Sequence, residues 1–154
     1  MRIKLKLYQH SDSYLYGGNI ELIGSKIDVA DNVTLKAVSG QIIQISGQIK
    51  ADDIIADAET KITLNTSLNS VDLSLSDKGN ITVFNDKNIT LTDVQTKDGA
   101  IEVKTTGDIF VTSAKTLGSS DVNDFTLTAL ELKTVTNGVT TTSGGNVTLT
   151  DISL

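Results

Sequence analysis

The chain has 154 residues, which suits a single domain with a buried core. It contains no cysteine, which excludes disulfide scaffolds and thiol catalysis, and its net charge of -6 argues against nucleic acid and anionic membranes as partners. Aromatic residues make up only 4% of the chain and proline is absent, whereas 38% of residues are hydrophobic. This composition predicts an aliphatic core of β-strands, because β-branched side chains pack well on a pleated surface and proline cannot donate to a strand ladder.

Residues 1–16 differ in pattern from the rest of the chain. Ile3, Leu5 and Leu7 alternate with charged residues, as in a strand, and all three tyrosines follow within this segment. We predict that the segment caps the open end of the domain that follows it, or that it donates a strand to another molecule. No signal peptide is visible and no apolar run approaches the length of a membrane-spanning helix, so we expect no membrane insertion.

From residue 17 onward, short alternating segments such as Ile81-Thr82-Val83 predominate, with a few turn-forming residues between them. A motif recurs in which a glycine and a small or polar residue precede a β-branched residue, as in Gly79-Asn80-Ile81. The leading aliphatic residues recur every 19 to 24 positions. They form a first ladder, through Ile20, Ile42, Ile62, Ile81, Ile101, Phe125 and Val147.

The same repeat indicates two further ladders. The second passes through Ile27, Ile49, Val71, Ile89, Ile109 and Leu130, and the third through Val33, Ile54, Val94 and Val135. Because very short strands are stable only when stacked on their neighbours, the ladders predict a parallel β-helix (β-solenoid) over residues 17–154, with about seven coils. The alternative all-β fold is an antiparallel sandwich, for which only Asn137-Gly138 supplies a tight hairpin sequence.

The repeat is interrupted between Ser113 and Asp124, where a longer polar stretch predicts a protruding loop. At the C-terminus, the alternating strand pattern continues to the last residue and no polar capping segment follows it, which predicts an exposed strand edge. We therefore expect head-to-tail stacking of identical chains, in which the first strand of one copy covers the last coil of another. The assembly residues of this hypothesis are Ile3, Leu5, Leu7, Val147, Leu149, Ile152 and Leu154.

Candidate catalytic and metal-binding residues are few. His10 is the one histidine, and we interpret it as a solvated residue of the N-terminal segment. Asp52, Asp53 and Asp57 form the densest acidic group and are weak candidates for calcium ligands, with a solvated turn as the competing interpretation. A second, weaker calcium candidate comprises Asp121, Asn123 and Asp124. No cofactor and no catalytic residue is predicted.

Two surface patterns accompany the strands. An outward column is predicted to read Thr63, Thr82, Glu102, Thr126 and Thr148, so that Glu102 interrupts the regular threonine array that an ice-binding solenoid presents to water. Asn-x-Ser/Thr sequences follow from turn asparagines placed before strand threonines, and we interpret them as turn chemistry. They begin at Asn32, Asn65, Asn80, Asn88 and Asn146.

The segments Gly99-Ala100-Ile101-Glu102-Val103 and Gly107-Asp108-Ile109-Phe110-Val111 resemble the repeats of filamentous-haemagglutinin-type exported bacterial adhesins. The resemblance covers roughly residues 17 to 154. It implies a right-handed, single-stranded parallel β-helix and an extracellular or cell-surface location in a bacterium. The partner is then a second copy of the chain or the rest of a larger surface protein.

We predict a structural or adhesive solenoid and not an enzyme. The alternative function is a carbohydrate-binding or polysaccharide-cleaving β-helix, with glycans as partners, and the minor alternative is an ice-binding solenoid. An acidic cleft with bound calcium would distinguish the enzyme or lectin from the structural protein.

Overall fold

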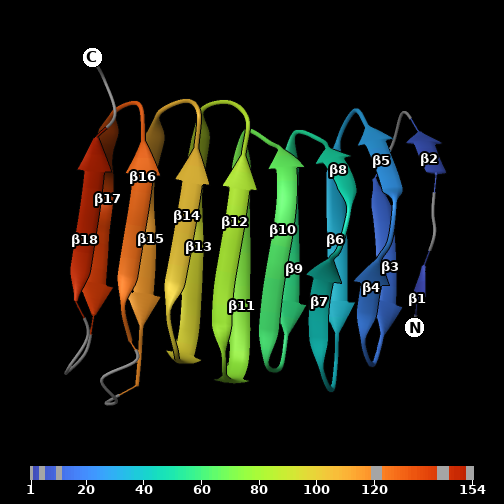
Figure 1. The fold of residues 1–154 in the computed structure, drawn as a ribbon, viewed down its shortest axis with the longest axis horizontal. Coiled ribbons are helices and arrows are strands. Elements are labelled where there is room, and N and C mark those ends of the chain that lie inside the picture. The colour runs from blue at the N-terminus through green and yellow to red at the C-terminus, as the bar shows by residue number, and fades with distance from the viewer. Residues whose placement is uncertain (1, 4–5, 10–11, 119–122, 142–145, 152–154) are drawn as a thin grey trace.

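The computed structural model describes residues 2–3, 6–9, 12–118, 123–141 and 146–151, and this part of the chain contains strands and no helix (Figure 1). Accordingly, no helix in the described ranges is long and apolar enough to cross a membrane. The strands are β1 (Arg2–Ile3), β2 (Lys6–Gln9), β3 (Ser13–Gly17), β4 (Ile20–Leu22), β5 (Ser25–Val29), β6 (Asn32–Ala37), β7 (Gln41–Gln44), β8 (Gly47–Lys50), β9 (Asp53–Ala58), β10 (Lys61–Ser67), β11 (Ser70–Lys78), β12 (Asn80–Asn85), β13 (Ile89–Asp98), β14 (Ile101–Thr105), β15 (Ile109–Thr116), β16 (Phe125–Ala129), β17 (Leu132–Thr141) and β18 (Val147–Asp151).

The strands form two parallel sheets that face each other across one aliphatic core. Sheet A has the order β1-β4-β7-β10-β12-β14-β16-β18, with β2, β5 and β8 beside it, and sheet B has the order β17-β15-β13-β11-β9-β6-β3. The chain alternates between the sheets and winds through about six turns. The predicted parallel β-solenoid is therefore confirmed. The antiparallel sandwich is excluded because the described strands pair in parallel, and Asn137 and Gly138 lie inside β17 and not in a hairpin turn. The right-handed sense stays a prediction.

The first ladder is confirmed at every step. Ile20 pairs with Ile42, and the register continues without a shift through Ile62, Ile81, Ile101 and Phe125 to Val147. The ladder side chains from Ile20 to Phe125 are fully buried. These steps hold because each strand of sheet A begins at an equivalent point of its turn, directly after the recurring turn residues.

The second and third ladders are confirmed only in part. The steps from Ile89 to Ile109 and from Val33 to Ile54 pair as predicted. Ile27 pairs with Ile49 as predicted, but Ile49 then pairs with Thr66. Val71 belongs to sheet B, where it pairs with Ile54 and Leu91. Further corrections concern Ile109, which pairs with Leu132 and not Leu130, and Val94, which pairs with Leu73 and Ala114 and not Ile54.

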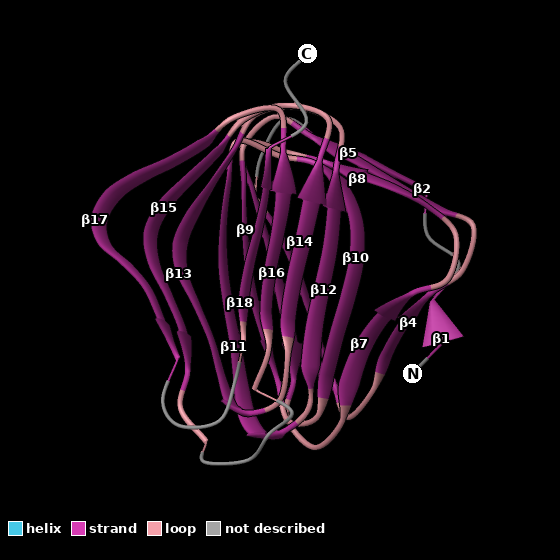
Figure 2. Cartoon of the chain, turned by 60° about the vertical axis from the view of Figure 1, so that its left-hand side comes forward, coloured by secondary structure: helices cyan, strands magenta, loops and turns pink. Residues whose placement is uncertain are grey.

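The physical reason for these errors is a change of cross-section along the solenoid. In the first turns, sheet A is bent, so that β4 and β5, or β7 and β8, lie on two sides of an additional corner (Figure 2). The single strand β10 then pairs with β7 through residues 61–63 and with β8 through residues 66–67. Gly47 turns this corner with a φ of 96°, in the left-handed region that favours glycine. From β10 onward, each turn has two strands in place of three.

The first turn of the solenoid contains β1, β2 and β3. Strands β1, β2 and β3 pair in parallel with β4, β5 and β6. The segment thus has the same architecture as the turn that follows it, and β3 extends across the expected domain boundary at residue 16. Its predicted role as a cap or strand donor stays a prediction.

The predicted loop between Ser113 and Asp124 is shorter than expected. Residues 113–116 belong to β15, and Ser113, Ala114 and Thr116 are buried. The end of this strand could not be recognised in the sequence because β13 has a register shift against β11. After the shift, the inward-facing side chains are no longer at the alternate positions that the first half of the strand predicts. β15 pairs with β13 on both sides of that shift, which accounts for two consecutive buried residues, Ser113 and Ala114.

Asparagine and aspartate side chains join consecutive turns. Asn80 Oδ1 accepts a hydrogen bond from the Ala100 N–H at 2.9 Å, and Asn88 Oδ1 accepts one from the Asp108 N–H at 2.9 Å. Asp124 Oδ1 likewise accepts from the backbone N–H of Asn146 at 3.0 Å. Turn residues at these positions therefore satisfy backbone donors of the following turn.

Candidate functional site

The outer face of sheet B gathers aromatic, charged and hydroxyl side chains. One row crosses four strands, since Tyr16 pairs with Lys36, Lys36 with Asp57, and Asp57 with Ser74. Parallel strands in register hold such side chains about 4.8 Å apart. Residues that are about 20 positions apart in the sequence thus become neighbours.

Tyr14 and Tyr16 form an exposed aromatic pair at the N-terminal end of this face. They lie two residues apart on β3, so both side chains point outward from the same side of the strand. The ring centroids are 6.4 Å apart and the ring planes differ by 15°. The exposed fractions of the two residues are 61% and 56%, which leaves much of both rings open to solvent. Their spacing in a strand is the signal by which the sequence analysis could have found this pair.

An open groove of about 320 Å³ lies on the same face, next to the pair. Within it, Lys36 Nζ is 4.0 Å from Asp57 Oδ2. Ser74 Oγ donates a hydrogen bond to Asp57 Oδ1 at 2.6 Å. The groove therefore presents an ammonium group, a carboxylate and hydroxyl groups beside the aromatic rings. Its lining residues come from β6, β9 and β11 and from the ends of these strands: Lys36, Ala37, Val38, Asp57, Ala58, Ser74 and Ser76.

Aspartates gather on the middle strands of this face. Asp72 on β11 is paired in register with Asp93 on β13, and Asp57 lies on the neighbouring strand β9. Burial raises the pKa of Asp72, and the negative charges of Asp93 and Asp57 raise it further. Lys115 Nζ lies 3.7 Å from Asp93 Oδ1 and offsets part of this repulsion. The face consequently disfavours anionic ligands.

We expect Asp72→Asn to raise the melting temperature at pH 7 and to have little effect below about pH 3. A carboxyl group whose pKa is raised in the folded state contributes stability below its unfolded pKa, and that contribution is lost as the pH rises through its folded pKa. Asparagine carries no charge, so the variant does not lose stability in this way as the pH rises. The expected gain is about 1–2 °C, in keeping with a surface change of about 0.5 kcal/mol. Thermal unfolding followed by circular dichroism at both pH values measures it, and an equal shift at both would contradict an electrostatic cause.

The predicted calcium ligands do not converge. Asp52 Oδ1 accepts a hydrogen bond from Asn69 Nδ2 at 3.0 Å, and Asp53 Oδ1 accepts one from Ser70 Oγ at 2.6 Å. Asp57 lies four residues further along β9, about 13 Å away in an extended strand. Across the described ranges, no group of three or more His, Cys, Asp or Glu side chains could hold a metal ion. The three aspartates instead bind neighbouring turns.

The second calcium candidate and the histidine fall partly outside the described residues, which do not include His10 and Asp121. Asn123 is buried, and its Oδ1 accepts a hydrogen bond from the Gly99 N–H at 2.7 Å. Asp124 Oδ1 faces the Asn146 N–H. The oxygens of Asn123 and Asp124 thus bind backbone donors on two different turns and do not form a shared site.

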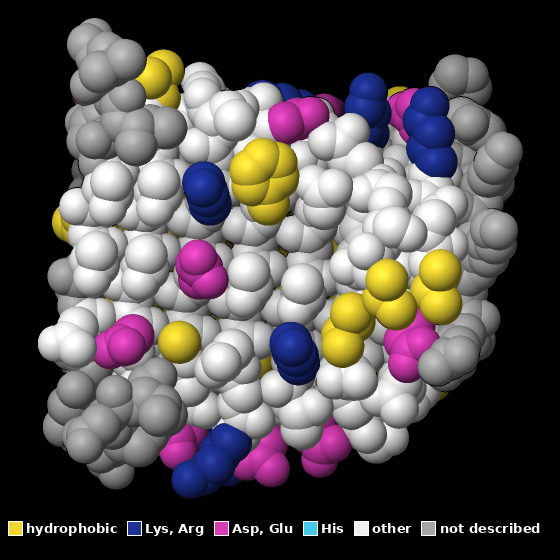
Figure 3. Space-filling view, viewed as in Figure 1, with side chains coloured by type: hydrophobic (Ala, Val, Ile, Leu, Met, Phe, Trp, Pro, Cys, Tyr) yellow, Lys and Arg dark blue, Asp and Glu magenta, His cyan; other side chains and the backbone are white. Residues whose placement is uncertain are grey.

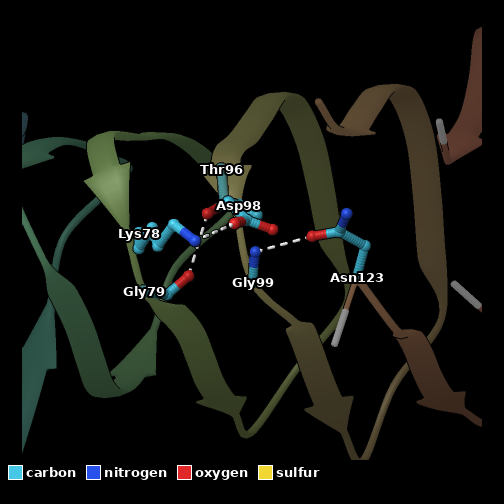
Figure 4. Close-up of polar contacts among 6 residues, drawn as sticks. All are labelled: Lys78, Gly79, Thr96, Asp98, Gly99 and Asn123. Carbon is cyan, nitrogen blue, oxygen red and sulfur yellow. Dashed lines mark hydrogen bonds and ion pairs between the residues drawn. The ribbon is translucent and has the colours of Figure 1, made fainter. Parts of the chain in front are cut away.

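A second open groove, of about 350 Å³, lies at the corner between β11 and β12. Lys78 Nζ is 2.9 Å from Asp98 Oδ2 (Figure 4), and the hydrogen bond and the attraction from Asp98 raise the pKa of Lys78. Nearby, Thr96 Oγ1 donates to the carbonyl oxygen of Gly79 at 2.8 Å. These contacts join neighbouring turns, so the polar groups here stabilise the corner. The groove is lined by Asp77, Lys78, Lys97, Asp98, Leu117 and Gly118.

A buried polar row at the opposite corner of the solenoid was missed by the sequence analysis. Thr66, Asn85 and Thr105 pair in register and are fully buried or nearly so. Asn85 Oδ1 accepts from Thr66 Oγ1 and from the Leu68 N–H, each at 2.9 Å. Asn85 Nδ2 donates to the carbonyl oxygens of Leu68 and Lys87, at 3.1 and 2.8 Å. The signal was present, since Asn85 continues the inward alternation of Ile81 and Val83 in β12.

No protein-family model, curated protein or solved structure matches this chain. The resemblance to filamentous-haemagglutinin-type repeats therefore stays a prediction. The observations that bear on function are the fold, the two end turns and the outer faces of the sheets.

The outer face of sheet A carries mainly uncharged polar side chains (Figure 3). The predicted column is confirmed, because Thr63, Thr82, Glu102, Thr126 and Thr148 pair in register. Glu102 interrupts the threonines, as expected. In the neighbouring column, the partly exposed Phe84 and then Lys104 precede Thr128, so the threonine array is not continuous.

Four of the predicted assembly residues lie in described strands, at the two ends of the solenoid (Figure 1). Ile3 is in β1 and Leu7 in β2, whereas Val147 and Leu149 are in β18. Leu149 is 56% exposed, although its partner Leu127 is 1% exposed, because β18 is the last strand of sheet A within the described residues. The remaining assembly residues, Leu5, Ile152 and Leu154, lie outside the described ranges.

Proposed function

We propose that the protein is a structural β-solenoid of a bacterial cell surface or extracellular fibre, where it acts as a rigid, adhesive rod and not as an enzyme. The observation that carries this proposal is the unshifted core ladder, which joins each turn of sheet A to the next from Ile20 to Val147. Side chains such as Asn80 and Asn88 add hydrogen bonds between turns. Each inner turn is thus held on both sides, which favours stiffness and resistance to local opening.

The partner in this proposal is a second copy of the chain or the rest of a larger surface protein. An edge strand presents backbone N–H and C=O groups that can pair with another strand. Head-to-tail contact between β18 of one copy and β1 of the next would also cover Leu149. Such a contact does not close on itself and so generates filaments. It joins a two-sided turn to a three-sided one, a change that the chain already accommodates between β7, β8 and β10.

We expect the purified protein to form filaments with a layer spacing of about 4.8 Å, and Leu149→Lys to abolish them. Lysine places a charge at an inward position that the next turn must bury. Thr148→Lys is the matched control, because Thr148 lies on the outer face and its neighbour in the ladder is the outward Thr126. Electron microscopy over a concentration range, with fibre diffraction for the spacing, provides the measurement.

Two results would count against this proposal. Short, monodisperse particles at every concentration would overturn self-assembly. Rapid native-state proteolysis within the ladder strands would overturn the rigid rod itself, because cleavage there requires the turns to open.

A further inference from the structure

We propose that the outer face of sheet B around Tyr14 and Tyr16 binds a neutral polysaccharide. The inference names the ligand class for the adhesive part of the proposed function, on which it rests. It does not depend on filament formation, since the site lies on a lateral face and not on the end strands. Two independent features point to it, the aromatic pair and the groove beside that pair.

The tyrosine pair fits the apolar face of a sugar ring. The axial C–H groups of a pyranose form a flat apolar surface, which packs on an aromatic ring, while the tyrosine hydroxyl remains at the wet rim. The two rings are stacked, with centroids 6.4 Å apart and planes 15° from parallel, and both residues remain more than half exposed, which leaves ring surface open for such a contact. Ile55 adds a partly exposed apolar side chain to this face, because Thr34 pairs with both Tyr14 and Ile55.

The groove supplies the hydrogen-bonding groups that a sugar needs. Sugar hydroxyls both donate and accept, so a sugar site combines apolar contact with a few placed donors and acceptors. Lys36 donates, Asp57 accepts, and the oxygen of Ser74, whose proton is donated to Asp57, is a further acceptor. Because Tyr16 and Lys36 are neighbours in the ladder, the aromatic pair and the groove form one continuous surface.

The charges on this face select a neutral ligand. Lys36 and Asp57 lie 4.0 Å apart and neutralise each other within the groove. The next aspartates along the face, Asp72 and Asp93, are near enough to Asp57 that Asp57 and Asp93 raise the pKa of Asp72. A polymer of uronic acids or a sulfated glycan would meet this negative charge, whereas a neutral polysaccharide would not.

Tyrosine fluorescence gives a direct readout of the site. The chain has no tryptophan, and its three tyrosines all lie within the first sixteen residues. We expect titration with soluble neutral polysaccharides (β-glucan, xyloglucan and galactomannan) to change the emission for at least one of them and to retard the protein in affinity gels that contain it. Polygalacturonate is the charged probe and should do neither.

The variants separate binding from folding and from assembly. Tyr14→Ala with Tyr16→Ala should weaken binding at least about tenfold, a change that corresponds to the loss of one or two aromatic contacts. Phe84→Ala, which removes an exposed aromatic side chain from the opposite face, should leave binding unchanged. Lys36→Gln with Ser74→Ala should weaken binding while leaving the tyrosines in place, and it serves as the test if the alanine variant does not fold.

Four results would overturn the proposal. The first three are the absence of a response to any of the neutral polysaccharides, equal binding to polygalacturonate, and unchanged retardation of the folded tyrosine variant. The fourth is association of the protein with itself through the tyrosines without polysaccharide binding, which would assign the face to a protein contact. Loss of filaments with retained binding would instead count against head-to-tail assembly alone.

Discussion

Replacing Ile81 by aspartate is expected to lower the free energy of unfolding by about 4 kcal/mol or more. Ile81 is fully buried in the middle of the first ladder, between Ile62 and Ile101. A carboxylate there loses its hydration without gaining a partner, since its ladder neighbours are hydrocarbon. Protonation reduces the cost but leaves a buried polar group and a lost apolar side chain.

The effect should be visible as a fall in melting temperature of about 10 °C or more for a chain of this length. Thr82→Asp provides the control, because Thr82 occupies the next, outward position of the same strand. We expect that variant to change the stability by less than about 1 kcal/mol. Thermal and urea unfolding followed by circular dichroism compare the two. Equal stability of Ile81→Asp and the parent would mean that the ladder is not the core.

Asn85→Ala is expected to destabilise the protein by about 2–4 kcal/mol. The side chain of Asn85 satisfies four polar groups at the corner, from Thr66, Leu68 and Lys87. Water cannot readily replace it because the residue is fully buried. The groups that remain unpaired then carry their full desolvation cost.

Two further variants decide whether hydrogen bonding is the cause. Asn85→Leu restores volume and adds apolar surface, yet it should also destabilise, since the backbone groups of Leu68 remain unpaired. Asn80→Ala removes an exposed asparagine that accepts one backbone hydrogen bond, and it should cost less than about 1 kcal/mol. Greater stability of Asn85→Leu than of the parent would show that the corner requires only packing. Denaturant unfolding distinguishes these outcomes.

The first ladder could be aligned from the sequence because every step is local in character. A glycine or asparagine stands one or two residues before the ladder residue in six of the seven repeats, Ile62 being the exception. Ile20 and Phe125 can therefore be placed in one column without any knowledge of the other strands. The column through Thr63 and Glu102 followed from the same alignment. In the second ladder, Ile89 and Ile109 follow such turn residues and their pairing is confirmed. Leu130 has no such marker, and Val71 lies in the other sheet from Ile49, so at both places the alignment went wrong.

The candidate ligand-binding face was likewise only partly predictable from the sequence. Proximity along the sequence suggested Asp52, Asp53 and Asp57 as a site, but adjacent residues of a strand point to opposite faces and distant ones lie far apart along it. The residues that do come together, Tyr16 and Lys36, are separated by a whole turn of the solenoid. Spacing within β3 could have indicated the tyrosine pair, but not the groove beside it.

The sequence by itself determined that the protein is a stack of short parallel strands with an aliphatic interior, because alternation and turn residues are properties of each repeat alone. Only the tertiary structure decided the remaining strand neighbours outside the first ladder, the place where the cross-section changes from three sides to two, and which polar side chains meet. The reason is that register depends on the number of residues in each complete turn. A corner at Gly47 or a register shift in β13 alters that number without leaving a mark in the local pattern.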